Sequence, residues 1–193
     1  MKEFDDARVS FYLENRALID EWAKLSDEVP KLCRKFMWSL RKDFNELASQ
    51  KGSDISVYAE QSDHPKLFLH REHWVSAGDS EFEDRTDVGI GVEWEKNNVD
   101  FSLSGSRPYV GVWTNKRTDR GGQLREDLEQ LTGEDSSNSN WVRRQYIAPA
   151  EEIWWENLDS YREVLLENIA KEWEEYSEAI EKAVAGLRGS KIT

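Results

Sequence analysis

The sequence VGIGVEWEKNNVDFSLSG, residues 88–105, is the clearest structural signal in the chain. Its first half is apolar at every second position, which is the pattern of a strand with one buried face. The two asparagines Asn97 and Asn98 then suit a two-residue turn, because asparagine tolerates positive φ angles. We therefore expect a β-hairpin that places Trp94 opposite Phe101 and keeps the large side chains together.

Other short strands extend this signal in both directions. The segment YVGVWT, residues 109–114, is apolar on both faces and is expected in the interior of a sheet. Alternation and turn residues also predict strands at Ile55–Ala59, Leu67–Arg71 and Trp141–Ile147. Residues 54–147 therefore form a β-rich core of about five to six strands with one short helix.

Helical periodicity flanks this core on both sides. Residues 5–50 read as a helical pair, 5–28 and 30–48, because Pro30 suits the first turn of a new helix. Residues 150–188 carry apolar residues at spacings of three or four throughout. An unbroken helix would be roughly 55 Å long, so a break near Asp159 and Ser160, where Ser160 and Glu163 have the form of a capping box, is an alternative.

This order of elements predicts the fold class. We expect one α+β domain over residues 1–193, with an antiparallel or mixed β-sheet covered by two N-terminal helices and a long C-terminal helix. The sequence leaves open whether residues 150–188 pack against the sheet or extend outward.

Charge limits the partners of this domain. The 193 residues include 39 acidic and 26 basic side chains, for a net charge of −13. An acidic envelope repels nucleic acid at long range and disfavours binding to a membrane surface. No apolar run approaches the roughly 18 residues of a transmembrane helix, and one cysteine, Cys33, excludes an internal disulfide. The chain is therefore expected to be cytoplasmic, with no membrane association.

Basic residues suggest the first candidate site. Arginine matches phosphate geometry, and a neighbouring tryptophan can stack on a base. The residues that we assign to a candidate anion- or nucleic-acid-binding site are Lys116, Arg117, Arg120, Trp141, Arg143 and Arg144. A second basic stripe follows the helix at Lys31, Arg34, Lys35, Trp38, Arg41 and Lys42. The alternative is that these bases pair with the surplus acids around them.

Carboxylates suggest a second candidate site. Asp87, Glu93 and Glu95 are the acids that a magnesium-dependent hydrolase would use. In the expected hairpin Glu95 faces Asp100, and like charges placed in this way are unfavourable unless they are solvated or bridged by a cation. A solvated sheet face is the alternative, so we predict no catalytic residue, no metal site and no cofactor, with Mg²⁺ as the exception to test. His70 and His73 are not expected to bind a metal together, because they lie three residues apart at a strand end and their side chains point to opposite faces.

The order of motifs over about residues 86–147 resembles a known superfamily. VGIGVEWEK, then YVGVWTNK, the acidic helix LREDLEQLTGED and WVRRQYI resemble small proteins related to the PD-(D/E)xK restriction-endonuclease-like superfamily. The resemblance implies binding of DNA or RNA, with cleavage by a metal that an Asp and a Glu hold beside a Lys. Here Glu93 is followed by Glu95, and Lys96 would face away on the strand. The catalytic triplet is not matched, so the resemblance implies an inactive or binding-only relative.

Tryptophans on the last helix suggest a protein interface. Trp154 and Trp155 are adjacent, so both cannot face one core, and exposed tryptophan is typical of interfaces. The long C-terminal helix also offers a surface for self-association. We therefore predict a non-enzymatic intracellular interaction protein that binds another protein through acidic and Trp-rich helical surfaces. The alternative is a nucleic-acid- or nucleotide-binding, divergent or inactive nuclease-like domain that uses the basic region 116–144.

Overall fold

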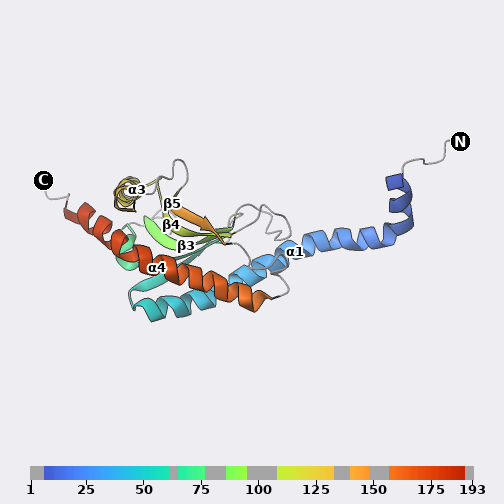
Figure 1. The fold of residues 1–193 in the computed structure, drawn as a ribbon, viewed down its shortest axis with the longest axis horizontal. Helices are drawn as coiled ribbons and strands as arrows, with labels where there is room; N and C mark the ends of the chain where they lie inside the picture. Colours follow the sequence, from blue (N-terminus) through green and yellow to red (C-terminus); the bar gives the residue numbers. More distant parts are fainter. Residues whose placement is uncertain are drawn as a thin grey trace.

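The chain folds as an α+β domain, as the sequence predicts. The computed structural model describes residues 7–60, 65–76, 86–94, 108–132, 140–147 and 157–189. In chain order the elements are α1 (Ala7–Lys51), β1 (Ile55–Glu60), β2 (Lys66–Arg71), the short 3₁₀ helix η1 (Glu72–Trp74), β3 (Val88–Trp94), β4 (Pro108–Thr114), α3 (Asp119–Thr132), β5 (Trp141–Tyr146) and α4 (Leu158–Gly189). Figure 1 shows α4 and the last part of α1 lying along the sheet.

The five strands form one antiparallel sheet in the order β1-β2-β3-β4-β5. β3 has a neighbour on each side, with Val92 opposite Leu67 of β2 and Val110 of β4. Trp94 lies opposite Pro108, so the predicted pairing of Trp94 with Phe101 is wrong. The local alternation did identify a strand, but β2 and β4, which are distant in sequence, occupy both of its edges. The predicted turn lies outside the described residues.

The two faces of the sheet are different. The first, which we call the helix face, carries the aliphatic residues that alternate along β2, β3 and β4. The second, which we call the aromatic face, carries Phe68, Tyr109, Trp113 and Trp141, with Tyr58 packed against them. β3 contributes glycine to this face, and a Cβ at Gly91 would overlap the Phe68 ring and the Leu67 carbonyl oxygen. The bare backbone of β3 therefore makes room for the aromatic rings.

The N-terminal helical stretches expected at 5–28 and 30–48 are both helical, and they join without interruption in α1. The last part of α1 packs into the core, where Leu40 and Phe44 are fully buried. It runs parallel to α4, since Phe36 contacts Tyr161 and Lys51 forms an ion pair with Glu174 further along both helices. These contacts attach α1 to the body of the molecule from Phe36 onward.

α4 packs against the helix face along its length. Its buried hydrophobic residues are Tyr161, Leu165, Ile169, Trp173, Tyr176, Ile180, Ala183 and Val184. The helix begins at Leu158, and the Oδ1 of Asn157 accepts a hydrogen bond from the backbone N–H of Ser160 at 3.0 Å. Asn157 is therefore the N-cap, and the predicted capping box at Ser160 and Glu163 is wrong. Helix α4 is continuous from Leu158 to Gly189.

The short helix α3 closes one end of the core. The Thr118 hydroxyl accepts a hydrogen bond from the Gly121 N–H at 2.9 Å and so caps its first turn. Leu124 and Leu128 are buried, whereas Leu131, three residues after Leu128, is 54% exposed. No helix among the described residues is long and apolar enough to cross a membrane.

Candidate interaction surface

Asp87, a candidate catalytic residue, is buried and binds the loop before α3. Its carboxylate accepts hydrogen bonds from the hydroxyls of Ser76 at 2.7 Å and Thr118 at 3.1 Å. It also forms an ion pair with Arg120 at 3.1 Å, and Arg120 donates to the His73 carbonyl oxygen. Asp87 thus fixes the start of α3, and Arg120, a candidate anion ligand, is already occupied by this pair.

Glu93, the second candidate carboxylate, lies at the other end of β3 on the aromatic face. Its Oε2 accepts a hydrogen bond from the indole N–H of Trp141 at 2.8 Å, and both side chains are buried. Six residues of extended strand separate Glu93 from Asp87, which is roughly 20 Å. The structure therefore does not bring these two acids together, and Glu95 lies outside the described residues. No cluster of three His, Cys, Asp or Glu side chains that could hold a metal is found in the described part of the chain.

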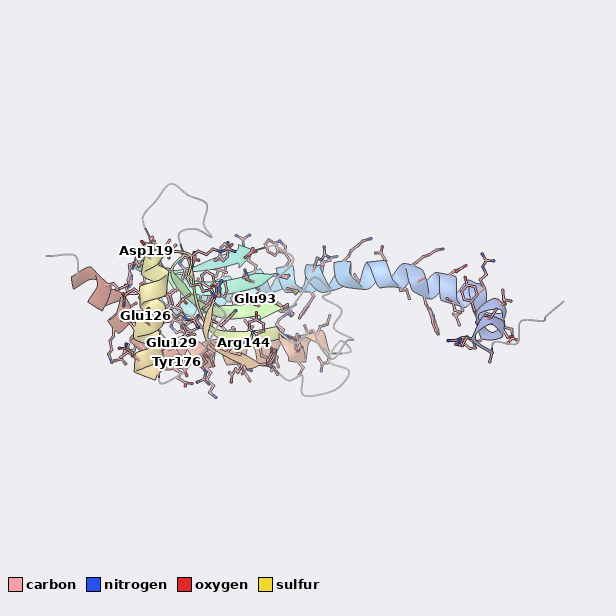
Figure 2. The ribbon with its side chains drawn as sticks, turned by 90° about the horizontal axis from the view of Figure 1, so that it is seen from above. Glu93, Asp119, Glu126, Glu129, Arg144 and Tyr176 are labelled. Carbon is pink, nitrogen blue, oxygen red and sulfur yellow. The ribbon has the colours of Figure 1, made fainter. Side chains whose placement is uncertain are left out.

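The predicted basic site is dispersed in the structure. Lys116 and Arg117 are exposed in the loop that leads to Asp119, and this end of α3 lies well apart from Arg144 (Figure 2). Arg143 and Arg144 are neighbours in β5 and point to opposite faces of the sheet, because side chains alternate along a strand. The six residues therefore do not form a single surface.

Arg143 lies on the helix face, where α4 neutralises it. Its guanidinium approaches Glu175 at 3.4 Å and the buried Glu172 at 3.8 Å, and it donates a hydrogen bond to the Tyr176 hydroxyl. Burial raises the pKa of Tyr176 to about 12, which the nearby Arg143 partly opposes. Arg143 therefore joins β5 to α4.

Arg144 lies on the aromatic face. Its guanidinium stacks over the ring of Tyr109 at 5.1 Å and over that of Tyr146 at 5.8 Å. A β-bulge between Val112 and Trp113 changes the register here. Val142 consequently packs in the core of the helix face, although strict alternation along Trp141–Ile147 would place it on the same face as Arg144. Arg144 is thus part of an aromatic cluster.

The first 29 residues of α1, residues 7–35, extend away from the body, and we call them the arm (Figure 1). Figure 2 shows the same extension from above, and the darkest-blue turns at its start are set at an angle to the rest in Figure 1. Large apolar side chains of the arm are exposed along one stripe: Phe11 61%, Leu18 43%, Trp22 60%, Leu25 52% and Leu32 63%. The arm would be about 43 Å long as an ideal helix.

An exposed apolar stripe of this size has a physical consequence. Full burial of a large aliphatic or aromatic side chain contributes about 1.5–3 kcal/mol, and most helical stability in proteins comes from packing of the amphipathic face. Local ion pairs such as Lys31–Glu28 at 2.7 Å and Arg16–Asp20 at 3.6 Å add only a few tenths of a kcal/mol each. A partner that covers the stripe would therefore stabilise the helix of the arm.

The predicted protein-interface residues are not where the exposed apolar surface lies. Trp154 and Trp155 lie outside the described residues. The apolar series of α4, the predicted surface for self-association, is buried against the sheet. The sequence did show the periodicity of Leu18, Trp22 and Leu25, but it did not show that this face is exposed. A further signal is the recurrence of large apolar residues every seven positions from Phe11 to Leu32, which continues past Pro30.

No family model matches this chain, and the comparisons with curated proteins and with solved structures give no match. The resemblance to the PD-(D/E)xK superfamily therefore stays a prediction. The functional argument rests on the geometry of the chain itself.

Proposed function

We propose that this chain is a non-enzymatic interaction protein that binds a helix of another polypeptide through the apolar stripe of its arm. The observation that carries the proposal is the exposure of Phe11, Leu18, Trp22, Leu25 and Leu32 on one side of a helix held away from the body. Large contiguous apolar surfaces on folded proteins mark interaction sites. An amphipathic helix that presents residues at spacings of three and four is also a common docking element.

Two further observations bear on the role of the chain and on the compartment in which it acts. Asp87 and Glu93 each have structural partners and lie at opposite ends of β3. The single cysteine of the chain fits the reducing cytoplasm, where we place this interaction.

The nucleic-acid alternative has weaker support. Its predicted site is divided between a loop and two faces of the sheet. What remains is the exposed cationic stripe of α1, formed by Lys31, Arg34, Lys35, Arg41 and Lys42. Part of this cationic stripe lies in the arm, so an experiment on the arm must distinguish a protein partner from a nucleic-acid partner.

Affinity capture from a lysate of the native host tests the proposal. The bait is the tagged full chain, compared with Leu25→Lys and with Leu13→Lys as a matched control. Leu13 is as exposed as Leu25, at 55% against 52%, but it lies on the opposite side of the helix from Phe11. We expect a protein partner that the wild type and Leu13→Lys capture, that Leu25→Lys loses, and that nuclease treatment does not release. Equal capture by both variants contradicts the proposal, and release by nuclease favours the alternative.

A further inference from the structure

The apolar stripe of the arm has the seven-residue repeat of a coiled coil, in which it would form the seam between two helices. Large apolar residues recur every seven positions at Phe11, Leu18, Leu25 and Leu32. A second series, four positions after the first three of these, runs Asn15, Trp22 and Val29. Apolar residues at alternating spacings of four and three over three to four heptads predict that a helix pairs with another helix.

The charges of the arm suit a second copy of the same helix. The chain carries a net charge of −13, but residues 7–35 contain five acidic and six basic side chains. Each arm therefore carries a net charge of only +1, so two arms approach each other with little repulsion.

We propose that the occupant of the stripe is the arm of a second copy, aligned parallel and in register, so that the chain is a homodimer. This rests on the proposed function, because it names the partner of the same surface.

The flanking residues are compatible with the parallel alignment. Glu14, Glu21, Glu28 and Lys35 flank one side of the seam. In a parallel pair each of these glutamates lies beside the other flank of its partner, where Ile19, Ser26 and Cys33 carry no charge at neutral pH. An antiparallel pair would place Glu21 beside Glu28 of the other copy, where like charges repel, and Glu14 beside Lys35, where opposite charges attract. The flanking charges therefore give the antiparallel pair no advantage.

Asn15 favours the parallel alignment. It is the polar residue within the apolar seam, and its Nδ2 donates a hydrogen bond to the Phe11 carbonyl oxygen at 2.9 Å. In a parallel pair its amide meets that of Asn15 of the second copy, with which it can form a further hydrogen bond, and one asparagine at such a position fixes register. In the antiparallel pair it would lie against Leu32, where its amide oxygen would have no donor.

Sedimentation velocity on the full chain, from about 1 to about 100 µM, tests the self-association. We expect a wild-type dimer whose dissociation constant rises by about 100-fold or more in Leu25→Lys, because one leucine is lost from each copy in the same layer. Leu13→Lys, on the other side of the helix, leaves the dimer unchanged.

Disulfide trapping tests the orientation. In the background Cys33→Ser, the substitution Leu18→Cys places two thiols in one layer of a parallel pair, and mild oxidation links them. In the antiparallel pair the two positions are offset by about 16 Å along the axis, so no link forms. Leu13→Cys in the same background is the matched control and remains unlinked.

Each outcome is decisive. A chain that stays monomeric up to about 100 µM overturns self-pairing, and the proposed function survives if Leu25→Lys alone loses a different captured partner. A dimer that resists Leu25→Lys overturns self-pairing through the arm, and the affinity capture then decides the proposed function separately. A dimer that Leu25→Lys dissociates but Leu18→Cys fails to link overturns the parallel alignment.

Discussion

The two parts of α1 have the same local pattern and opposite environments. Before Phe36, Trp22 and Leu25 recur at helical spacing and are more than half exposed, whereas Leu40 and Phe44 further along are fully buried. The difference arises because α4 and the sheet flank only the last part of the helix (Figure 1). Apolar periodicity thus shows which side of a helix seeks a partner, and the tertiary structure shows whether this chain supplies it.

The largest expected effect compares an aromatic residue in each part. Phe44→Ala removes a fully buried ring and should lower the free energy of unfolding by about 3–5 kcal/mol. Trp22→Ala, in the arm, should change the free energy of unfolding of the body by less than about 0.5 kcal/mol. Urea unfolding followed by fluorescence at low protein concentration measures both. Similar losses in the two variants would show that the body covers the arm.

Ion pairs sharpen the comparison. Arg120→Ala leaves Asp87 buried without its cation and should cost about 3 kcal/mol of stability. Lys31→Ala removes the exposed partner of Glu28 in the arm and should cost at most about 1 kcal/mol. The same unfolding measurement compares the two variants. A negligible effect of Arg120→Ala would mean that the hydroxyls of Ser76 and Thr118 satisfy Asp87 alone.

Two glycines of the body differ in the same way, since Gly91 is tightly packed and Gly186 has open space beside it. Gly91→Ala forces a methyl group against Phe68 and should destabilise the fold by about 1–3 kcal/mol. Gly186→Ala in α4 meets no atom within 4 Å, and it should stabilise the fold by up to about 1 kcal/mol through helix propensity. Thermal unfolding of both variants checks the opposite signs. A Gly91→Ala protein with an unchanged Tm would show that the aromatic face is loosely packed.

The smallest effect is a pH dependence confined to the body. Burial lowers the pKa of His70 below its ordinary value near 6.5, with partial opposition from the Arg71 carbonyl and Glu72. The unfolded chain therefore binds this proton more tightly, and stability falls as the pH drops below about 6.5 towards the folded pKa. The arm contains no histidine.

Urea unfolding of the wild type and His70→Gln between about pH 7.5 and 5 measures this dependence. His70→Gln should flatten the acid side of the profile. An unchanged profile would assign the loss of stability to other groups.

Much of the fold could be predicted from the sequence. Alternation and turn residues identified β1, β2, β3 and β5, a segment apolar on both faces identified β4, and the spacing of three and four identified α4 and both parts of α1. The antiparallel pairing partners of β3 could not be predicted, because an alternating strand fits any partner whose apolar face matches. The β5 bulge that separates Val142 from Arg144 was also missed, since it depends on the register with β4.

The candidate site was less predictable than the fold. Adjacent basic residues in the sequence suggested a cluster, but Arg143 and Arg144 are bound to α4 and to the aromatic face respectively. The carboxylate of Asp87 accepts hydrogen bonds from Ser76, which follows η1, and from Thr118, which precedes α3. Both residues lie more than ten positions from Asp87 in the sequence. Such pairings depend on the approach of distant segments.

By itself the sequence determined the amphipathic elements of this protein, since helix and strand periods are local properties of the chain. Only the tertiary structure decided which apolar stripes are covered. The reason is that burial requires a second surface, and its position depends on how the sheet and α4 come together. For α1 that surface begins at Phe36, which leaves the arm exposed.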